Sequence, residues 1–478
     1  MVGDEARLVW GCSACLRVRE RPPRDHRRLV ETTEDLAAAA GHSVDAEGWL
    51  AEFDTGFAAI AGRFGRVEPR RQARAFLLGL LSDVDTRSCW QLAEHAGDGS
   101  PHAMQRLLGE TVWDADAVRD DVRGYAVDAL GEAGGVLILD DTGDLKKGCL
   151  TIGTQRQYTG TAGRIENAQV AVYLAYATTA GSTLIDREVY LPKAWTDDRA
   201  RCAAAGVPDD VRFATKITLG RRMLTRALDA GVSAAWCTAD EFYGGDHHLR
   251  RDLQARGVGY VLAVAKSHRV IARTVDGPVR ADRLAATLPD RAWNQISAGR
   301  GSKGERDYDW AWMTINPPAG EVGGCHSLLV RRRISDGELA FYRCWTPTPV
   351  PLRTLVRVAG TRWNVETCFQ TGKSIGLDEP QVRRWDSWYR HVTLVMLAHA
   401  ILTVIATRER DNRTDHDQTL IALTFHEIRR LITRLITNTV HTIDHWLHWS
   451  AWRRRHQARA RTSHYRRRGH IAYQPAST

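Results

Sequence analysis

The segment VLILDD, residues 136–141, decides the fold: four consecutive apolar residues lead directly into two acidic ones. A short apolar run of this kind predicts a buried strand, so Asp140 and Asp141 stand near a strand end. A second run, VSAAWCTAD at 232–240, ends in Asp240 in the same way. We therefore expect an α/β fold in which Asp141 and Asp240 lie on neighbouring strands and can share a metal.

A third carboxylate, Glu366, lies in the segment RWNVETCFQTGK, residues 362–373. On one helix, Arg362, Glu366 and Lys373 would project from about the same face. Mg²⁺ takes oxygen ligands from a few carboxylates and from substrate phosphates. Two such ions stabilise both the attacking and the leaving oxygen of an in-line displacement. The three acidic positions predict that Asp141, Asp240 and Glu366 are catalytic and hold two Mg²⁺ ions, for which Mn²⁺ would substitute.

The same residues carry a family resemblance. Arg362, Glu366 and Lys373 match three positions of a Y-x2-R-x3-E-x6-K signature, and the chain resembles the DDE transposases of bacterial insertion sequences that carry it. The blocks DTGDLKKG (141–148) and ADEFYG (239–244) are similar to the two aspartate blocks of that family. The tyrosine of the signature is replaced by Ala359, which removes any phosphate contact from that side chain.

Each acidic position has an alternative interpretation. Asp140 and Asp141 point to opposite faces of a strand, so only one of them can bind the metal. Asp141 is favoured because the residue before Thr142 matches the family aspartate. Asp240 alone would be read as a helix N-cap, and Glu366 alone as an exposed ion pair with Arg362.

The order of the predicted elements indicates an RNase H-like core. The strand at 136–141, a hairpin of 169–177 and 183–191, a helix near 215–230 and the strand at 232–240 follow that order. The long interval between Asp240 and Glu366 requires an insertion. The predicted parts are a flexible extension (1–45), a helical DNA-binding domain (46–130), the core in two pieces (131–266 and 351–410) around a mainly β insertion (267–350), and a helical arginine-rich region (411–478).

Charge indicates a nucleic-acid partner. The net charge is +9, and eight arginines after residue 444 account for nearly all of it. Such a cluster binds phosphates, although a solvated, disordered tail is the alternative. A second arginine cluster, at 63–74, is either a DNA contact or a solvated helix face. Tyr158 and Trp195 are candidates for stacking on bases. The predicted DNA-binding residues are Arg362, Lys373, Lys146, Lys147, Arg156, Arg453, Arg454, Arg455, Arg466, Arg467 and Arg468.

Cysteine usage and hydropathy indicate the compartment. The nine cysteines are scattered and odd in number, which is typical of a reducing environment. Cys12 and Cys15 have zinc-ligand spacing but lack a second pair. The N-terminus has no apolar signal segment, and the apolar stretch 394–406 is short for a membrane span. We expect a soluble cytoplasmic protein without a membrane partner.

The resemblance implies a cut-and-paste transposase. It would act on double-stranded DNA, both the terminal inverted repeats of its element and the target, and it would work as a homodimer in the DNA complex. Two alternatives remain at the level of sequence. One is a DNA-binding relic of a transposase without catalysis, and the other is a metal-dependent nuclease that cuts without strand transfer.

Overall fold

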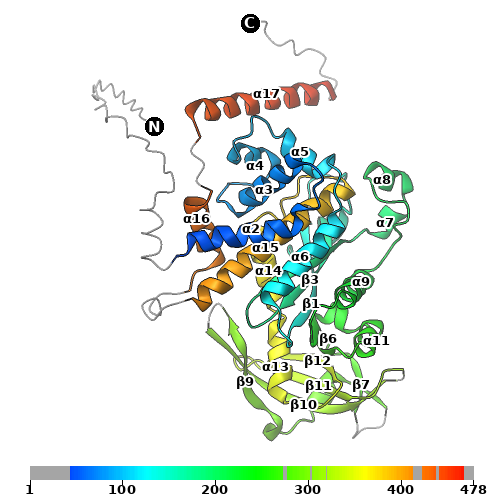
Figure 1. Ribbon diagram of the computed structural model, residues 1–478. Coiled ribbons are helices and arrows are strands. Elements are labelled where there is room, and N and C mark those ends of the chain that lie inside the picture. The colour runs from blue at the N-terminus through cyan, green and yellow to red at the C-terminus, as the bar shows by residue number, and fades with distance from the viewer. Residues whose placement is uncertain are drawn as a thin grey trace, which may run out of the picture.

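The computed structural model describes residues 44–272, 277–301, 304–318, 320–412, 422–437 and 441–467. Its centre is one mixed sheet with helices on both faces (Figure 1). The strand order is β2-β3-β1-β5-β6-β12-β11-β10-β7-β8, with β4 paired to β3 and β9 paired to β10. Nearly all of the predicted N-terminal extension, including Cys12 and Cys15, lies outside the described residues, as does Arg468.

Five strands form the central part of the sheet, in the order β4-β3-β1-β5-β6. Strand β3 is antiparallel to β1 and to β4, whereas β1, β5 and β6 run parallel to one another. This mixed α/β arrangement is consistent with the predicted RNase H-like core. The bounds are β1 (Val136–Leu145), β3 (Arg164–Ala177), β4 (Ser182–Val189), β5 (Trp236–Ala239) and β6 (Gly259–Val264).

Two details of these strands differ from the sequence prediction. Strand β1 continues four residues past Asp141 because it keeps its antiparallel partner β3 after β5 has ended. Strand β2 (Gln155–Thr159) was not predicted, and it pairs with the first residues of β3. The two carboxylates of β1 therefore lie where the strand loses its parallel neighbour, not at its end.

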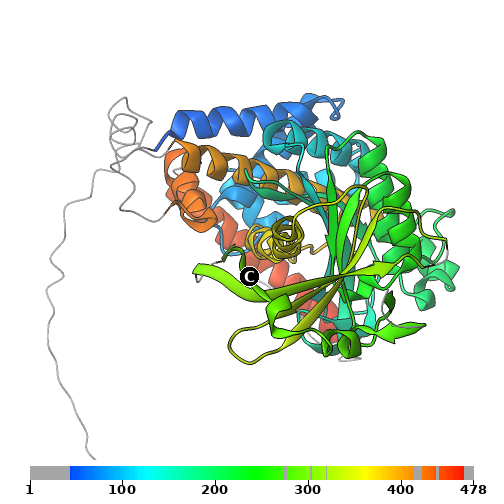
Figure 2. The same ribbon diagram turned by 90° about the horizontal axis from the view of Figure 1, so that it is seen from below.

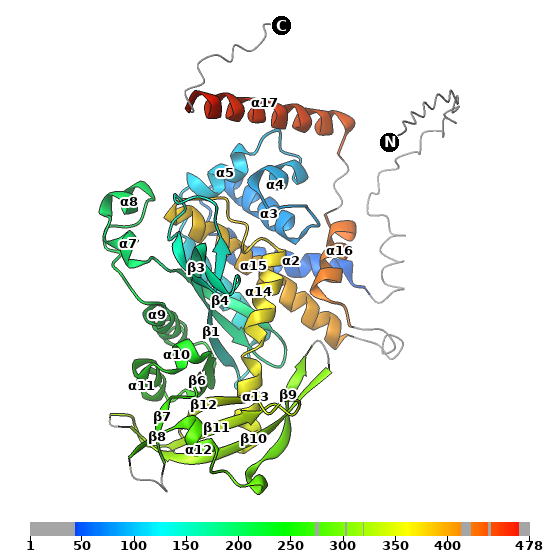
Figure 3. The ribbon, with the colours of Figure 1, turned by 180° about the vertical axis from the view of Figure 1, so that it is seen from behind.

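Helices cover the two faces of the central strands (Figures 2 and 3). One face is packed against α6, α14 and α15, and the other against α9 and α11. The N-terminal helices and α16 pack around α15, and all share one hydrophobic core with the sheet, so 46–130 has no separate core. These helices are α2 (Ala46–Ala61), α3 (Val67–Leu81), α4 (Cys89–His95), α5 (His102–Gly109), α6 (Ala115–Leu130), α9 (Lys216–Asp229), α11 (His247–Ala255), α14 (Asn364–Ser374), α15 (Trp385–Asp411) and α16 (Phe425–Leu435).

The segment between β6 and α13 (Leu352–Thr361) is mainly β. Strand β12 pairs antiparallel with β6, so this segment extends the central sheet while keeping a small hydrophobic cluster of its own. Its strands lie within the predicted range 267–350. They are β7 (Arg269–Ala272), β8 (Pro278–Arg280), β9 (Asn294–Gly301), β10 (Gly304–Asn316), β11 (Cys325–Arg332) and β12 (Leu339–Thr346), with the short helix α12 (Ala281–Ala285) after β8.

Helix α15 is long and contains a strongly apolar window. By length and composition it could span a membrane, but 89% of its apolar window is buried inside the protein. It is longer than the predicted apolar stretch because polar residues at both ends continue the helix. Its apolarity is explained by its place between the sheet and the N-terminal helices.

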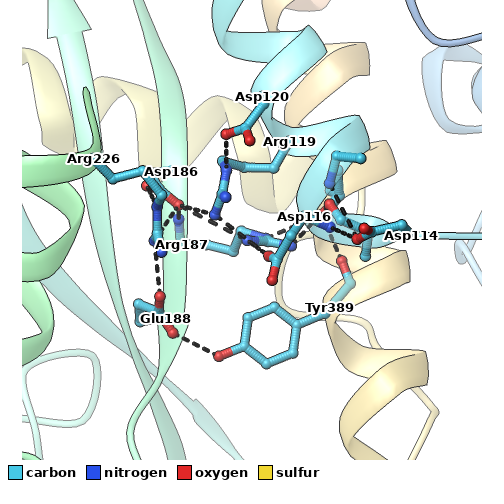
Figure 4. Close-up of polar contacts among 12 residues, drawn as sticks. Asp114, Asp116, Arg119, Asp120, Asp186, Arg187, Glu188, Arg226 and Tyr389 are labelled. Carbon is cyan, nitrogen blue, oxygen red and sulfur yellow. Dashed lines mark hydrogen bonds and ion pairs between the residues drawn. The ribbon is translucent and has the colours of Figure 1, made fainter. Parts of the chain in front are cut away.

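Buried charges fasten three helices to the edge strand β4 (Figure 4). Asp186 is fully buried and forms ion pairs with Arg119 of α6 (3.1 Å) and Arg226 of α9 (2.8 Å). The next residue, Arg187, bonds to Asp116 of α6 (2.8 Å) and to Thr393 of α15 (3.0 Å). Breaking such a buried network by removing one partner costs about 3–5 kcal/mol. The network therefore fixes α6, α9 and α15 relative to the sheet.

Two buried histidines of α15 predict acid sensitivity. Burial lowers the pKa of His391 and of His399 to about 4 from an ordinary value of 6.5. The unfolded chain then binds more protons between these values, so stability is complete above pH 6.5 and falls as the pH drops towards 4. Near pH 5, each histidine should cost about 2 kcal/mol of unfolding free energy.

We expect His391→Gln, which retains a donor for the Gly376 carbonyl, to reduce this acid loss by about 2 kcal/mol. Urea unfolding near pH 5 and near pH 7.5 measures the difference. An equal acid loss in the variant and the wild type would contradict the assignment.

Candidate active site

Parallel pairing of β1 with β5 places two carboxylates side by side. The last residues in register are Leu139 and Ala239, and the next residues are Asp140 and Asp240. Burial raises the pKa of Asp140 to about 7, and the charge of Asp240 adds to the rise while Arg362 opposes it. Burial also raises the pKa of Asp240. Two partly buried carboxylates that repel each other favour a bound cation.

Alternation along β1 sends Asp140 and Asp141 to opposite faces of the sheet. Leu139 packs over Gly220 of α9, and Asp141, on the same side, binds Lys216 at the start of α9. Asp140 points to the other face, where its Oδ2 lies 3.2 Å from Nη1 of Arg362. The structure therefore brings Asp140, and not Asp141, to the side of the sheet that carries Glu366.

Glu366 lies on the first turn of α14, beside the junction with α13. The prediction of one helix through 362–373 is wrong: α13 ends at Thr361 and α14 begins at Asn364. The backbone of the two residues between them stays helical, so the Arg362–Glu366 ion pair still forms, at 2.8 Å. One guanidinium thus links the carboxylate of Asp140 to that of Glu366.

Asp240 also caps a helix, as its alternative interpretation predicted. Its Oδ1 accepts hydrogen bonds from the backbone N–H groups of Phe242 (3.0 Å) and Tyr243 (3.3 Å) in the short helix α10 (Glu241–Gly244). Helix α10 lies directly on β6, because a side chain at Gly244 would collide with the carbonyl oxygen of Ala263. The cap orients Asp240, and within the described chain its Oδ2 has no hydrogen-bond partner.

The donor set fits a hard divalent cation, since carboxylate oxygens are the ligands such ions take. Among the described residues, however, no three His, Cys, Asp or Glu side chains lie within reach of one ion. The glutamate is the member that can move, because its side chain is 47% exposed and held only by Arg362. Asp140, Asp240 and Glu366 would then hold the metal after a rotation of Glu366.

Several predicted DNA contacts gather next to these carboxylates. Lys373, near the end of α14, donates to the hydroxyl of Thr161 (3.3 Å) in the turn between β2 and β3. That turn reaches β1 at Thr142, directly after the paired aspartates. Arg156 and Tyr158 are exposed at alternate positions of β2, Lys147 is exposed, and Lys146 is half-buried. The β2–β3 hairpin, the segment after β1 and the end of α14 thus place basic side chains beside the acidic site.

The C-terminal arginines lie elsewhere. Those up to Arg467 belong to helix α17 (Ile443–Arg467), whose buried Trp449 donates to the carbonyl of Asp98 just after α4, at the end of the molecule away from β7–β12 (Figures 1 and 3). Arg453 is engaged in an ion pair with Glu94 of α4. The residues with exposed side chains on this helix include Arg454, Arg455 and Arg466.

One sequence interpretation fails and several residues were missed. Trp195 cannot stack on a base, because it is buried and its indole N–H donates to the carbonyl of Thr154. Ala359 is buried within α13. The missed residues are Lys216, Phe242, Tyr243 and Trp363. Phe242, Tyr243 and Trp363 lie inside the segments ADEFYG and RWNVETCFQTGK, which the sequence singled out, whereas Lys216 lies in no such segment.

A family model described as "DDE superfamily endonuclease" matches residues 60–300, half of the chain. The chain belongs to this superfamily. The match includes the aspartates of β1 and β5 but ends before Glu366, which the structure alone brings to them. It confirms the resemblance found in the sequence. DDE superfamily endonucleases are generally dependent on divalent metals.

A similar protein gives further support for the assignment of the chain to this superfamily. It is the "Probable transposase for insertion sequence element IS701" of Microchaete diplosiphon, 26% identical over 195 residues. The alignment covers 40% of this chain and 48% of the relative. The likeness therefore spans about half of each protein.

Replacement of Asp140 and of Asp141 by asparagine should change the free energy of unfolding in opposite directions. The raised pKa of Asp140 means that its ionised form destabilises the fold, and this cost grows as the pH rises from about 4 to about 7 and is complete above 7. In EDTA near pH 8, Asp140→Asn should therefore raise the free energy of unfolding by about 4 kcal/mol. Asp141→Asn loses the Lys216 ion pair and should lower it. Denaturant unfolding measures both, and a destabilised Asp140→Asn variant would contradict the geometry.

Proposed function

We propose that the chain is the DNA transposase of an insertion sequence, which cuts the element ends and transfers the strands by two-metal chemistry. The observation behind the proposal is the convergence of Asp140, Asp240 and Glu366 at one edge of the sheet, in a chain of the DDE superfamily. The alternatives, a nuclease without strand transfer and a DNA-binding relic, lack a specific supporting observation.

In this proposal Asp140 takes the role that the sequence assigned to Asp141. The guanidinium of Arg362 forms ion pairs with both Asp140 and Glu366. Asp141 instead forms an ion pair with Lys216 on the other face of the sheet. Asp140, Asp240 and Glu366 would hold two Mg²⁺ ions, or Mn²⁺ in their place. Bound metals supply the charge that stabilises the attacking and leaving oxygens of the phosphodiester.

The chain's own cations would bind the substrate. Arg362 already lies between two carboxylates, so it can contact a phosphate once a metal takes over part of its role. Lys373 and the β2–β3 hairpin with Arg156 extend the positive surface from the carboxylates along the DNA backbone. The exposed Tyr158 offers a ring for stacking.

Helix α17 supports a second contact with DNA. Its exposed arginines lie on a helix anchored to the body by Trp449, and they would bind phosphates without reading sequence. A transposase must hold two ends of its element, so we propose terminal inverted repeats and target DNA as partners, and a homodimer as the form that acts on them.

The decisive test is metal-dependent cleavage and joining on a duplex that carries the inverted repeat flanking the gene. With Mg²⁺, the wild type should nick the end and give joined products. Glu366→Gln should reduce both by at least about 1000-fold while DNA binding persists, because a carboxylate ligand is lost.

Glu427→Gln is the matched control. Glu427 is 46% exposed on α16 and paired with Arg430 in the same helix, much as Glu366 is paired with Arg362. Its neutralisation should leave the activity unchanged. Nicking without joined products would show a nuclease, and binding without cleavage by the wild type would show a relic.

A further inference from the structure

We propose that Lys216 is a phosphate-contacting cation of this site and that Asp141 positions it. The inference rests on the proposed function, because it assigns a role in DNA cleavage to residues next to the metal-binding carboxylates. It gives Asp141 a task of its own that differs from metal binding.

The geometry holds the lysine closely. Lys216 is the first residue of α9, and the hydroxyl of Thr215 caps that helix by accepting from the backbone N–H of Thr218. Its Nζ lies 3.1 Å and 3.0 Å from the two carboxylate oxygens of Asp141. The hydroxyl of Tyr243 donates to the same carboxylate, at 3.1 Å. Asp141 is thus fixed from α9 and from α10 at once.

The ammonium keeps access to the surface. Its side chain is 22% exposed, and it lies 4.5 Å from the ring centre of Phe242, an aromatic residue that is itself 46% exposed. An ammonium carries three donors, of which Asp141 accepts two. The remaining donor and the exposed ring of Phe242 are therefore open to a phosphate and a base of a DNA strand bound beside the ends of β1 and β5.

Charge explains why such a cation is needed. The edge carries four carboxylates (Asp140, Asp141, Asp240 and Glu366) against the two cations Arg362 and Lys216. Since Arg362 lies on the α14 face and Lys216 on the α9 face, the two cations flank the Asp140–Asp240 pair. A phosphate that approaches this edge is attracted from both faces, and the charge of Asp141 is neutralised.

An ordinary structural ion pair is the competing explanation. A partly exposed pair contributes little to stability and takes no part in DNA contacts. Arg221, five residues further along α9, forms such a pair with Asp252 of α11, at 2.6 Å. Arg221→Met is therefore the matched control on the same helix.

The first measurement is equilibrium binding of the full chain to the end duplex, with Ca²⁺ in place of Mg²⁺. Single phosphates around the cut position are replaced one at a time by uncharged methylphosphonates. Wild type should bind more weakly when one of these phosphates is neutralised, and Lys216→Met should be insensitive at that position. The variant should also lower the slope of log affinity against log salt by about 1.

The second measurement is the single-turnover cleavage rate at saturating DNA. Lys216→Met should slow cleavage on the order of 100-fold, and Lys216→Arg should recover part of the rate. Asp141→Asn should give a smaller loss. The double variant should be no slower than Lys216→Met, because the two residues act as a unit. Arg221→Met should cleave as the wild type does.

Three results would overturn the inference. One is loss of cleavage in Asp141→Asn with a normal Lys216→Met variant, which would make Asp141 itself a metal ligand. Another is that Lys216→Met loses affinity at the same methylphosphonate positions as the wild type does. The third is a cleavage loss that follows only the fraction of folded protein. If the wild type binds with the phosphate effect but never cleaves, the proposed function fails while the binding measurement still decides for Lys216. A wild type that does not bind the duplex overturns both.

Discussion

The parallel pairing of β1 with β5 is the constraint on which the site depends. It brings together two aspartates that are 100 positions apart in the chain, at the point where β5 ends and β1 continues. The two carboxylates repel each other in a partly buried place, so the arrangement costs stability that the surrounding packing has to offset. Residues that lower stability in this way are typical of functional sites, where the local cost is part of the chemistry.

The edge network of β4 explains how the flanking helices stay in position. Arg226 ties α9 to Asp186, which fixes the rotation of that helix and thereby directs Lys216 at its other end to Asp141. Arg187 holds α15 through Thr393, and α14 packs on both α15 and β4. Since Glu366 lies on α14, the same edge strand supports both faces of the site.

Sequence alone predicted the strands and the acidic residues of the site, but not which of these residues face one another. The apolar runs before Asp140 and Asp240 gave the strands, and the predicted β-rich segment matches β7–β12, because these patterns depend on local burial. Which aspartate of β1 faces Glu366 depends on which helix covers which face, and that is a tertiary property. The family motif pointed to Asp141, whereas the packing of Leu139 on α9 places Asp141 away from Glu366.

The remaining differences have the same origin. Helix α13 lies directly on β9 just before it ends, because a side chain at Gly360 would collide with the carbonyl of Ala298, and the sequence does not reveal this contact. Trp195 is buried: its indole N–H donates to the carbonyl of Thr154 just before β2, and Arg201 covers its ring. The local sequence does not reveal these contacts. Lys216 belongs to no motif, and only the fold places it beside Asp141.

The most direct test of the central claim is a crystal structure of the complex with end DNA and Mn²⁺, with the metals located by anomalous scattering. The account predicts anomalous peaks within coordination distance of Asp140, Asp240 and a rotated Glu366, and none on Asp141. A peak coordinated by Asp141 instead of Asp140, or metals bound away from Glu366, would contradict it.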